Sequence, residues 1–232
     1  PTSRKAIKNA LKEGNLGLLI NEAVQQRDAH ADILDVNVGI PDVNEIEVLQ
    51  KVITEIQSVI DCPLQIDSSN HEAIDAAVRV YNGRPIINSV NGTEESMQRI
   101  FPLMVKYGAM AIALTLDERG LPKSMEDRVE ITEKILKHAA DYNIPADQFL
   151  FDCLVLTASV QQKEVMDTLN AIRVVKEKFG VKTTLGISNI SFGLPRREIL
   201  NSTYLAKALN VGLDAPICDP LAETNQHIIA SF

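Results

Sequence analysis

Acidic and amide side chains recur in this sequence at the ends of short apolar runs that are rich in β-branched residues. These positions are Asp35 with Asn37, Asp67, Asn88 with Ser89, Asp117, Asp152, and Ser188 with Asn189. A polar side chain at the end of a buried parallel strand is costly unless it binds something. Any one of them can equally be a helix N-cap, and Asp67 before Ser68, Ser69 and Asn70 could belong to a cap cluster. Six such positions in one chain favour a functional site.

The residue types at these positions suit a neutral heterocycle with fused amide and amidine edges. A carboxylate accepts two parallel hydrogen bonds from a guanidine-like pair of N–H groups, and an amide reads a neighbouring C=O and N–H. A 2-amino-4-oxo-pterin presents such an edge, and so does a purine, so the pattern leaves both open. No predicted strand runs into a G-x-G-x-x-G turn or a phosphate loop, and no His, Cys and Asp cluster has zinc spacing. We therefore expect no metal site and no phosphate cradle.

The apolar runs alternate with longer amphipathic stretches, as is typical of parallel β/α proteins. The predicted strands are Ile33–Val38, Pro63–Asp67, Pro85–Val90, Ala109–Leu116, Phe149–Leu154, Thr183–Ser188 and Leu213–Asp219. The predicted helices include Glu45–Val59, Glu94–Lys106, Glu126–Ala140, Lys163–Phe179 and Arg197–Asn210. Asn44 and Thr93 are predicted N-caps, Ser124 precedes an acidic first turn, and Gly108 and Gly180 are predicted C-terminal caps.

Parallel strands leave two architectures, a closed (β/α)8 barrel (a TIM barrel) and an open doubly wound sheet. The barrel is favoured because the sequence lacks the glycine-rich turn of the open nucleotide-binding sheets. Seven predicted strands are one short of a barrel, so we expect Pro1–Arg4 to be a loop into the first helix, with the first strand upstream. The tail after Pro220 is too short for a full last helix with any extension. In a barrel the polar strand ends converge on one mouth, where such folds place their chemistry.

The composition argues against nucleic-acid and membrane partners. The 232 residues carry a net charge of −8 and only 4% aromatic residues, which suits neither a phosphate backbone nor base stacking. No apolar run approaches a membrane span, and Cys62, Cys153 and Cys218 have no paired spacing, so we expect a cytoplasmic protein with free thiols. No linker divides the chain, which predicts a single domain over residues 1–232.

Several blocks of the sequence resemble one known family. They are Leu34-Asp35-Val36-Asn37-Val38-Gly39, Gln65-Ile66-Asp67-Ser68-Ser69, Ile87-Asn88-Ser89-Val90 and Leu185-Gly186-Ile187-Ser188-Asn189-Ile190-Ser191-Phe192-Gly193-Leu194-Pro195. They resemble the pterin-binding (methyltetrahydrofolate) domain of cobalamin-dependent methionine synthases and the methyltetrahydrofolate–corrinoid protein methyltransferases, and more distantly the dihydropteroate synthases. The resemblance runs in order from Pro1 to about Pro220, and its last block is the most specific. It implies a dihydropteroate-synthase-like (β/α)8 barrel, with Pro1-Thr2 at the end of its first-strand motif.

The resemblance also implies roles for particular side chains. The implied catalytic residue is Asn189, and the implied substrate-binding residues are Asp67, Asn88, Asp152, Gly186, Ser188, Arg197, Asp35 and Asn37. Within this set, Asp67, Asn88 and Asp152 would hold the pterin edge. Asn189 would approach the ring nitrogen that carries the methyl group, and Gly186 would let the ring approach the backbone.

Two positions depart from the family pattern. Relatives commonly have Gly where this chain has His30, and a left-handed backbone there would be tolerated by His at some cost in stability. Phe192 replaces a polar residue found in some stand-alone transferases, which argues against a hydrogen bond there and favours the methionine-synthase-like branch.

The activity that the resemblance implies is methyl transfer between N5 of 5-methyltetrahydrofolate and the cobalt of a corrinoid (cobalamin) carried by a partner protein. Two alternatives stay open. A dihydropteroate synthase would need a basic pyrophosphate site, for which the mouth segments offer little beyond Arg196 and Arg197. A folate-binding module without catalysis could also serve a larger corrinoid assembly. Stand-alone relatives are often dimers, so a homodimer is expected by analogy.

Overall fold

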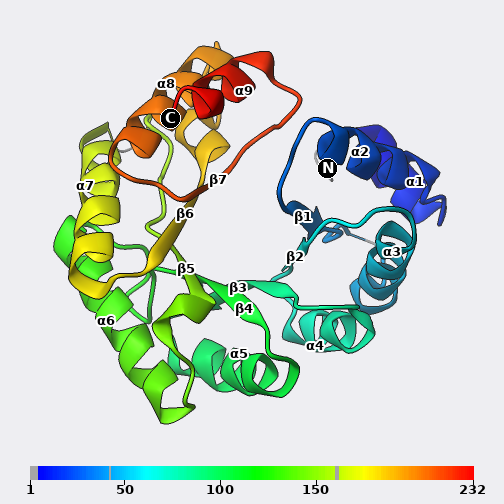
Figure 1. Cartoon of the computed structure of the whole chain (residues 1–232), viewed down its shortest axis with the longest axis horizontal. Coiled ribbons are helices and arrows are strands. Elements are labelled where there is room, and N and C mark those ends of the chain that lie inside the picture. Colours follow the sequence, from blue (N-terminus) through cyan, green and yellow to red (C-terminus); the bar gives the residue numbers. More distant parts are fainter. Residues whose placement is uncertain (1–4, 42, 160–161) are drawn as a thin grey trace. The chain divides into compact units, whose positions relative to one another are not determined.

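The structure, a computed structural model, describes residues 5–41, 43–159 and 162–232 and shows helices alternating with strands (Figure 1). The strands are β1 (Leu34–Asn37), β2 (Leu64–Asp67), β3 (Ile86–Asn91), β4 (Met110–Leu114), β5 (Phe149–Asp152), β6 (Lys182–Gly186) and β7 (Ala215–Ile217). The α-helices are α1 (Lys5–Lys12), α2 (Gly17–Asp28), α3 (Glu45–Val59), α4 (His71–Val80), α5 (Glu94–Tyr107), α6 (Met125–Asp141), α7 (Gln162–Phe179), α8 (Arg197–Asn210) and α9 (Glu223–Ala230). Two 3₁₀ turns are η1 (Ala146–Gln148) and η2 (Ile187–Ser191). The predicted Pro1–Arg4 loop, with the Pro1-Thr2 motif, lies outside the described residues.

The seven strands follow one another in the sheet in sequence order, from β1 to β7. The pairs β1–β2, β2–β3, β5–β6 and β6–β7 are parallel, with helices in the connections. All seven predicted strands are found, and the predicted parallel β/α alternation is confirmed. The strand order places the carboxyl end of each of these strands beside that of its neighbour, which is what the predicted site requires.

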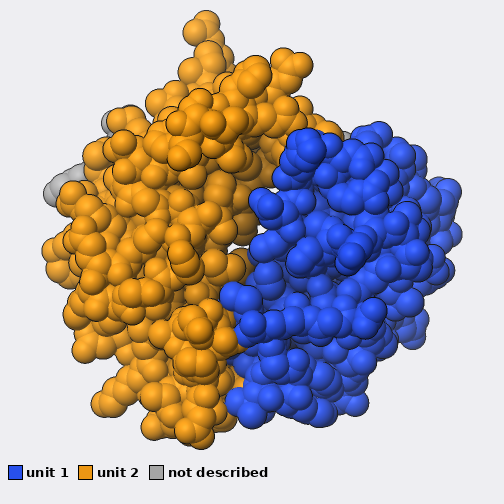
Figure 2. Space-filling view, viewed as in Figure 1, with its two compact units in different colours: residues 1–89, 102–111 blue, residues 90–101, 112–232 orange. Residues whose placement is uncertain are grey.

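The chain divides into two compact units, which are coloured separately in Figure 2. Unit 1 contains residues 1–89 and 102–111, and unit 2 contains residues 90–101 and 112–232. In unit 1 the apolar face of α3, with Leu49, Val52 and Ile53, is fully buried, as its spacing of three and four predicts. In unit 2 the ring of Phe149 packs edge-on against Phe101, with 6.0 Å between centroids. The prediction of a single domain stays a prediction.

Four predicted strands run two residues past the observed ones at their carboxyl ends. The predicted strands end at Leu116, Leu154, Ser188 and Asp219, whereas β4 to β7 end at Leu114, Asp152, Gly186 and Ile217. The chain leaves β5 at Leu154, whose φ is 53°, and it leaves β6 through the 3₁₀ turn η2. A left-handed residue and a 3₁₀ turn both end strand pairing, and apolar composition alone does not show them. The tail after Pro220 still contains the short helix α9.

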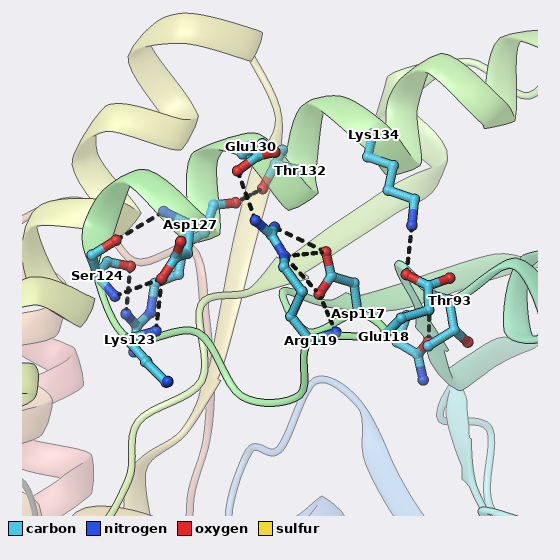
Figure 3. Close-up of polar contacts among 12 residues, drawn as sticks. Thr93, Asp117, Glu118, Arg119, Lys123, Ser124, Asp127, Glu130, Thr132 and Lys134 are labelled. Carbon is cyan, nitrogen blue, oxygen red and sulfur yellow. Dashed lines mark hydrogen bonds and ion pairs between the residues drawn. The ribbon is translucent and has the colours of Figure 1, made fainter.

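The helix caps agree with the prediction except at one position. Ser124 forms a capping box with Asp127, because each side chain accepts a hydrogen bond from the other residue's backbone N–H (Figure 3). Thr93 accepts from the N–H of Ser96 over 3.2 Å. Asn44 occupies the predicted N-cap position of α3, but its side chain makes no capping hydrogen bond. Gly108 and Gly180 have φ of 63° and 65°, as C-terminal caps require.

His30 has the left-handed backbone that was expected, with φ 64° at the end of α2. Within the described ranges, no helix is long and apolar enough to cross a membrane.

Replacing Ser124 with Ala should lower the free energy of unfolding by about 1 kcal/mol, because the first turn of α6 loses its cap. Chemical denaturation with an unchanged m-value would measure this difference. The matched control is Ser202→Ala inside α8, where the hydroxyl hydrogen-bonds only to backbone carbonyls of its own helix, those of Glu198 and Ile199, and Ala suits the helix better. A loss at Ser202 as large as that at Ser124 would contradict the role of the cap.

Candidate functional site

Three predicted site residues lie at one level on neighbouring strands of unit 1, where Asn37 and Asp67 end β1 and β2 and Asn88 lies within β3. In the register of the sheet, Asn37 of β1 lies beside Asp67 of β2, and Asp67 lies beside Asn88 of β3. Asn37 Nδ2 donates to Asp67 Oδ2 over 2.9 Å, and Asn37 Oδ1 accepts from the N–H of Gly39 over 3.0 Å. This unit therefore brings together an acid and two amides, as the polar strand ends predict.

Asp67 is not part of the cap of the helix that follows it. Asn70 caps α4, because its Oδ1 accepts from the backbone N–H groups of Glu72 and Ala73 over 3.0 and 3.3 Å. The hydroxyl of Ser68 accepts from the N–H of Asn70 over 2.9 Å. Capping thus explains Ser68 and Asn70, and it leaves the carboxylate of Asp67 at the strand end.

Asp35, two residues before Asn37 on β1, forms a carboxyl pair with Asp67. Gln65 Nε2 donates to Asp35 Oδ1, and the side chains of Asn88 and Asp67 also hydrogen-bond to this carboxyl group. Burial, followed by the negative charge of Asp67, raises the pKa of Asp35 from 3.8 to about 7. Burial also raises the pKa of Asp67. Near neutral pH the pair therefore holds a proton in part of the molecules, and one carboxyl can donate a hydrogen bond.

A pocket of about 350 Å³, open to solvent, lies beside β1 within unit 1. Its apolar lining is Leu19, Ala23, Leu34, Val36 and Ile56, and its polar lining is Glu22, Gln26, Asp35 and Asn37. Because β1 is the first strand in the sheet order, the pocket lies beside one end of the described strand series.

Asp152 ends β5 in unit 2, and only 7% of the residue is exposed. Its Oδ1 accepts from the N–H of Leu154 over 2.7 Å, and the N–H of Gly186 also donates to the carboxylate. Burial raises the pKa of Asp152 to about 6, against the opposing effect of these amides and of Arg128. At neutral pH the carboxylate is therefore mostly ionised, and two backbone donors leave part of its capacity of about four hydrogen bonds unused.

Gly186 and Asn189 lie next to each other where β6 passes into η2. Asn189 Nδ2 lies 3.0 Å from the position that a Cβ on Gly186 would occupy. Asn189 is exposed, and its side-chain amide makes no hydrogen bond within the described part of the chain. Unit 2 thus brings together a buried carboxylate, a backbone without a side chain and a free amide.

Arg197 at the start of α8 holds the turn that carries Asn189. Its Nη2 donates to Ser188 O over 3.1 Å, and its Nε donates to Ser191 Oγ over 3.0 Å. The hydroxyl of Ser191 continues the chain of contacts to Asn201 Oδ1 over 2.7 Å. Ser188 and Arg197 are therefore in direct contact, which fixes η2, and their role in substrate binding stays a prediction.

Asp117, one of the polar strand ends, is not available to a ligand. Its carboxylate accepts from the Nε and Nη2 of Arg119 and from the backbone N–H of the same residue, at distances of 2.9 to 3.1 Å (Figure 3). Although burial raises its pKa, the hydrogen bonds from Arg119 outweigh this effect and hold the pKa of Asp117 below its usual value. Arg119 also pairs with Glu130 over 3.1 Å. The functional interpretation of Asp117 is therefore wrong, because the residue closes its own turn.

A model of the pterin-binding enzyme family matches residues 2–219. The chain belongs to the pterin-binding enzyme family. This confirms the family that the sequence blocks indicate.

Curated relatives of this pterin-binding chain include the methylcorrinoid:tetrahydrofolate methyltransferase of Eubacterium limosum, which is 28% identical over 217 residues. That match covers 92% of this chain and 80% of the relative. The methionine synthases of Mycobacterium leprae and Mycobacterium tuberculosis are 30% and 32% identical over 226 and 206 residues. These matches cover 92% and 83% of this chain but only 19% and 17% of the synthases.

The fold of the pterin-binding chain is like that of dihydropteroate synthases. One crystal structure of dihydropteroate synthetase has a TM-score of 0.72 at 16% identity, covering 94% of this chain and 87% of that one. The synthase of Thermus thermophilus has a TM-score of 0.70 at 18% identity, covering 91% of this chain and 85% of that one. The fold class is therefore the predicted dihydropteroate-synthase-like β/α barrel.

Two polar residues next to the predicted set were missed by the sequence analysis. Gln65 donates to Asp35 from inside β2, and Arg128 on α6 is fully buried behind the end of β5. Both had a signal in the sequence. Gln65 interrupts an apolar strand, and Arg128 lies at the helical spacing of the buried residues Ile131 and Ile135.

Among the described residues of the pterin-binding chain, no group of three or more His, Cys, Asp and Glu side chains could hold a metal ion. Cys153 is a buried thiol, and burial raises its pKa well above the usual value, so the expected structural role fits. His71 is the first residue of α4, next to the capping Asn70.

The Asp35 pair predicts a pH-dependent stability. The folded state retains a proton on Asp35 that the unfolded chain releases between pH 3.8 and about 7, so the free energy of unfolding falls as pH rises through this window. Asp35→Asn removes this ionisation. The variant should therefore melt a few degrees above the wild type near pH 8, and the difference should vanish near pH 4.

Thermal melts of both proteins at several pH values would measure this effect. Asp61→Asn, which changes an exposed carboxylate of the same unit, should differ little from the wild type at either pH. A constant offset between Asp35→Asn and wild type across the pH range would contradict the raised pKa.

Proposed function

We propose that this chain binds the pterin of a reduced folate and moves a methyl group between N5 of 5-methyltetrahydrofolate and the cobalt of a corrinoid held by a partner protein. The observation that carries the proposal is the arrangement at β5 and β6: a buried carboxylate with unused acceptor capacity, beside an open glycine backbone and a free amide. Family membership and the activities of the relatives support this assignment.

The pterin edge is recognised by acids and amides. The carboxylate of Asp152 accepts the two N–H groups of the 2-amino-pyrimidinone edge, which matches an ionised acceptor that lacks a cation in direct contact. The family resemblance gives Asp67 and Asn88 of unit 1 a role at the pterin edge too, and within that unit Asn37 orients Asp67 through its hydrogen bond. Asp35, which shares its proton with Asp67, supplies either a donor or an acceptor at neutral pH.

Asn189 acts on the nitrogen that loses the methyl group. A methyl on a tertiary amine is a poor electrophile, because negative charge develops on the departing nitrogen. A side-chain amide donates a hydrogen bond that strengthens as this charge develops, and Asn189 is free to do so. The Co(I) of the corrinoid would supply the electron pair of the new Co–C bond as the N5–C bond breaks, and N5 would take up a proton from water. This chain therefore needs no nucleophile of its own. Arg197, through Ser188 and Ser191, keeps Asn189 in place.

A dihydropteroate synthase is the alternative that the likeness of fold raises, since those enzymes have TM-scores of 0.70 and 0.72 with this chain. At identities of 16% and 18%, this likeness shows a shared fold and does not show a shared reaction. A pyrophosphate leaving group also wants cations, and Arg197 already hydrogen-bonds to Ser188 and Ser191. Release of pyrophosphate from a pterin pyrophosphate and an aminobenzoate would favour this alternative.

The decisive experiment incubates the protein with 5-methyltetrahydrofolate and free cob(I)alamin and follows the absorption spectrum of the cobalt. Conversion to methylcobalamin supports the proposal. Tight folate binding without conversion would favour a binding module without catalysis.

Asn189→Ala should lower the rate constant for methyl transfer by a factor of about 10² to 10³, while the Kd for 5-methyltetrahydrofolate changes by less than about threefold. Stopped-flow absorption would give the rate, and calorimetry would give the Kd. The matched control is Asn210→Ala, an exposed asparagine at the end of α8, which should leave both values unchanged. Equal losses of rate and affinity in Asn189→Ala would remove its assigned role.

Folate affinity should fall on acidification, because the pKa of Asp152 is about 6 and only the ionised carboxylate accepts both N–H groups. The Kd should rise several-fold from pH 7.5 to about 5.5 in the wild type. Asp152→Asn should bind weakly and lose most of this dependence. Asp117→Asn is the control, since its carboxylate is bound by Arg119 and the variant should retain the dependence of the wild type. A wild-type Kd that does not change with pH would contradict the role of Asp152.

A further inference from the structure

Arg128 is a buried cation that hydrogen-bonds mainly to peptide carbonyls. It lies on α6 with 0% of the residue exposed. Its Nε donates to Cys153 O over 2.6 Å, its Nη1 to Ser124 O over 2.8 Å, and its Nη2 to Leu154 O over 3.1 Å. The same Nη2 donates to Thr168 Oγ1 of α7 over 3.2 Å. One guanidinium thus joins two helices to the segment that follows β5.

No described carboxylate forms a salt bridge with Arg128, although such a pair is the usual compensation for a buried charge. Glu164 and Asp167 of α7 interact with it only at longer range. Burial lowers the pKa of Arg128. A cation placed here is costly, and the contacts that compensate for the cost concentrate on two successive peptide carbonyls, those of Cys153 and Leu154.

Those two peptides directly follow Asp152, and one of them is strained. Leu154 has φ 53°, in the left-handed region that costs a side-chain-bearing residue about 1 kcal/mol or more. In this conformation the N–H of Leu154 points back and donates to Asp152 Oδ1 over 2.7 Å. The strained residue is therefore the one that fixes the direction of the Asp152 carboxylate.

We propose that Arg128 is a positioning residue for the carboxylate of Asp152, which binds the pterin. By holding the carbonyls of Cys153 and Leu154, it maintains the left-handed turn at Leu154 whose N–H orients Asp152. The inference rests on the proposed role of Asp152 and extends it to a residue that does not contact the pterin. Thr168 contributes by accepting from the guanidinium, and its hydroxyl proton is shared between Leu154 O and Glu164 O, each at 3.1 Å.

Arg128 is also the charged group that faces Asp152 across this part of unit 2. The other titratable side chains that interact with Asp152 are Cys153, the first residue after β5, and Tyr204 on α8. Burial raises the pKa of both well above the usual range, so both are neutral where Asp152 titrates. The positive charge of Arg128 lowers the pKa of Asp152 against the effect of burial. Loss of the charge should therefore move the titration of Asp152 upward.

The test uses Arg128→Lys and Arg128→Met, with Thr168→Val as a milder change that leaves the cation in place. A lysine retains the charge, but it lacks the planar fork that reaches two carbonyls at once. We expect Arg128→Lys to weaken 5-methyltetrahydrofolate binding about tenfold and Thr168→Val about twofold, with the transfer rate at saturating folate unchanged. The carboxyl carbon of Asp152, followed by ¹³C NMR without ligand, should titrate near pH 6 in the wild type and at least half a unit higher in Arg128→Met.

Ile135→Ala, at a fully buried position of the same helix, is the control for stability. It should lower the free energy of unfolding by about 2 to 5 kcal/mol and leave the Kd and the Asp152 titration unchanged. Wild-type affinity in folded Arg128→Lys, or an equal loss of affinity in Ile135→Ala, would overturn the proposal. If Arg128→Met does not fold, Arg128→Lys and Thr168→Val decide it.

Failure of the proposed function has a different signature: the wild type would not bind the folate, or Asp152→Asn would bind it equally well. The ligand-free titration of Asp152 would still report on Arg128 in that case.

Discussion

A carboxylate at the end of a buried parallel strand has lost part of its hydration, and the way this loss is compensated decides what the carboxylate can do. Asp117 is compensated by a cation in its own turn, because Arg119 donates three hydrogen bonds to it from its side chain and backbone. The charge of Asp152 is compensated by backbone N–H groups, while the cation Arg128 hydrogen-bonds to the neighbouring peptide carbonyl of Cys153 and not to the carboxylate itself. The first arrangement uses up the acceptor, whereas the second leaves it ionised and open to a ligand.

Unit 1 compensates its two acids in a third way, with neutral donors and a proton. Gln65 donates to Asp35, and Asn37 donates to Asp67, but no cation pairs with either acid among the described residues. Two close carboxyls without a cation retain a proton up to a higher pH, which is what the raised pKa values of both express. Such a pair changes its charge near neutral pH, so it can match a ligand edge that carries both donors and acceptors.

The sequence predicts the elements of this fold well and their carboxyl ends less well. The bounds of α3 and α8, Glu45–Val59 and Arg197–Asn210, agree with the prediction residue for residue, and buried apolar residues recur at helical spacing in both helices. The predicted ends of β5 and β6, Leu154 and Ser188, lie two residues beyond the observed ends, Asp152 and Gly186. Apolar composition continues past the point where the backbone turns, and the turn at Leu154 depends on a contact with a distant helix.

The candidate site shows the same limit. The sequence shows which residue types it contains, but not which of their side chains are already bound by other residues of the chain. The strand-end pattern predicts the same role for Asp117 and Asp152. Only the position of Arg119, two residues after Asp117, indicates that the carboxylate of Asp117 is bound within its own turn. Arg128 carries a stronger signal, because it falls in the stripe of α6 that also holds Ile131 and Ile135. A lone arginine at core spacing, with no acid to pair with, implies that peptide carbonyls are its partners. The peptides that directly follow the end of a strand have such carbonyls free to accept hydrogen bonds. In this way Arg128, on a helix, is linked to the geometry of the Asp152 carboxylate, which it does not touch.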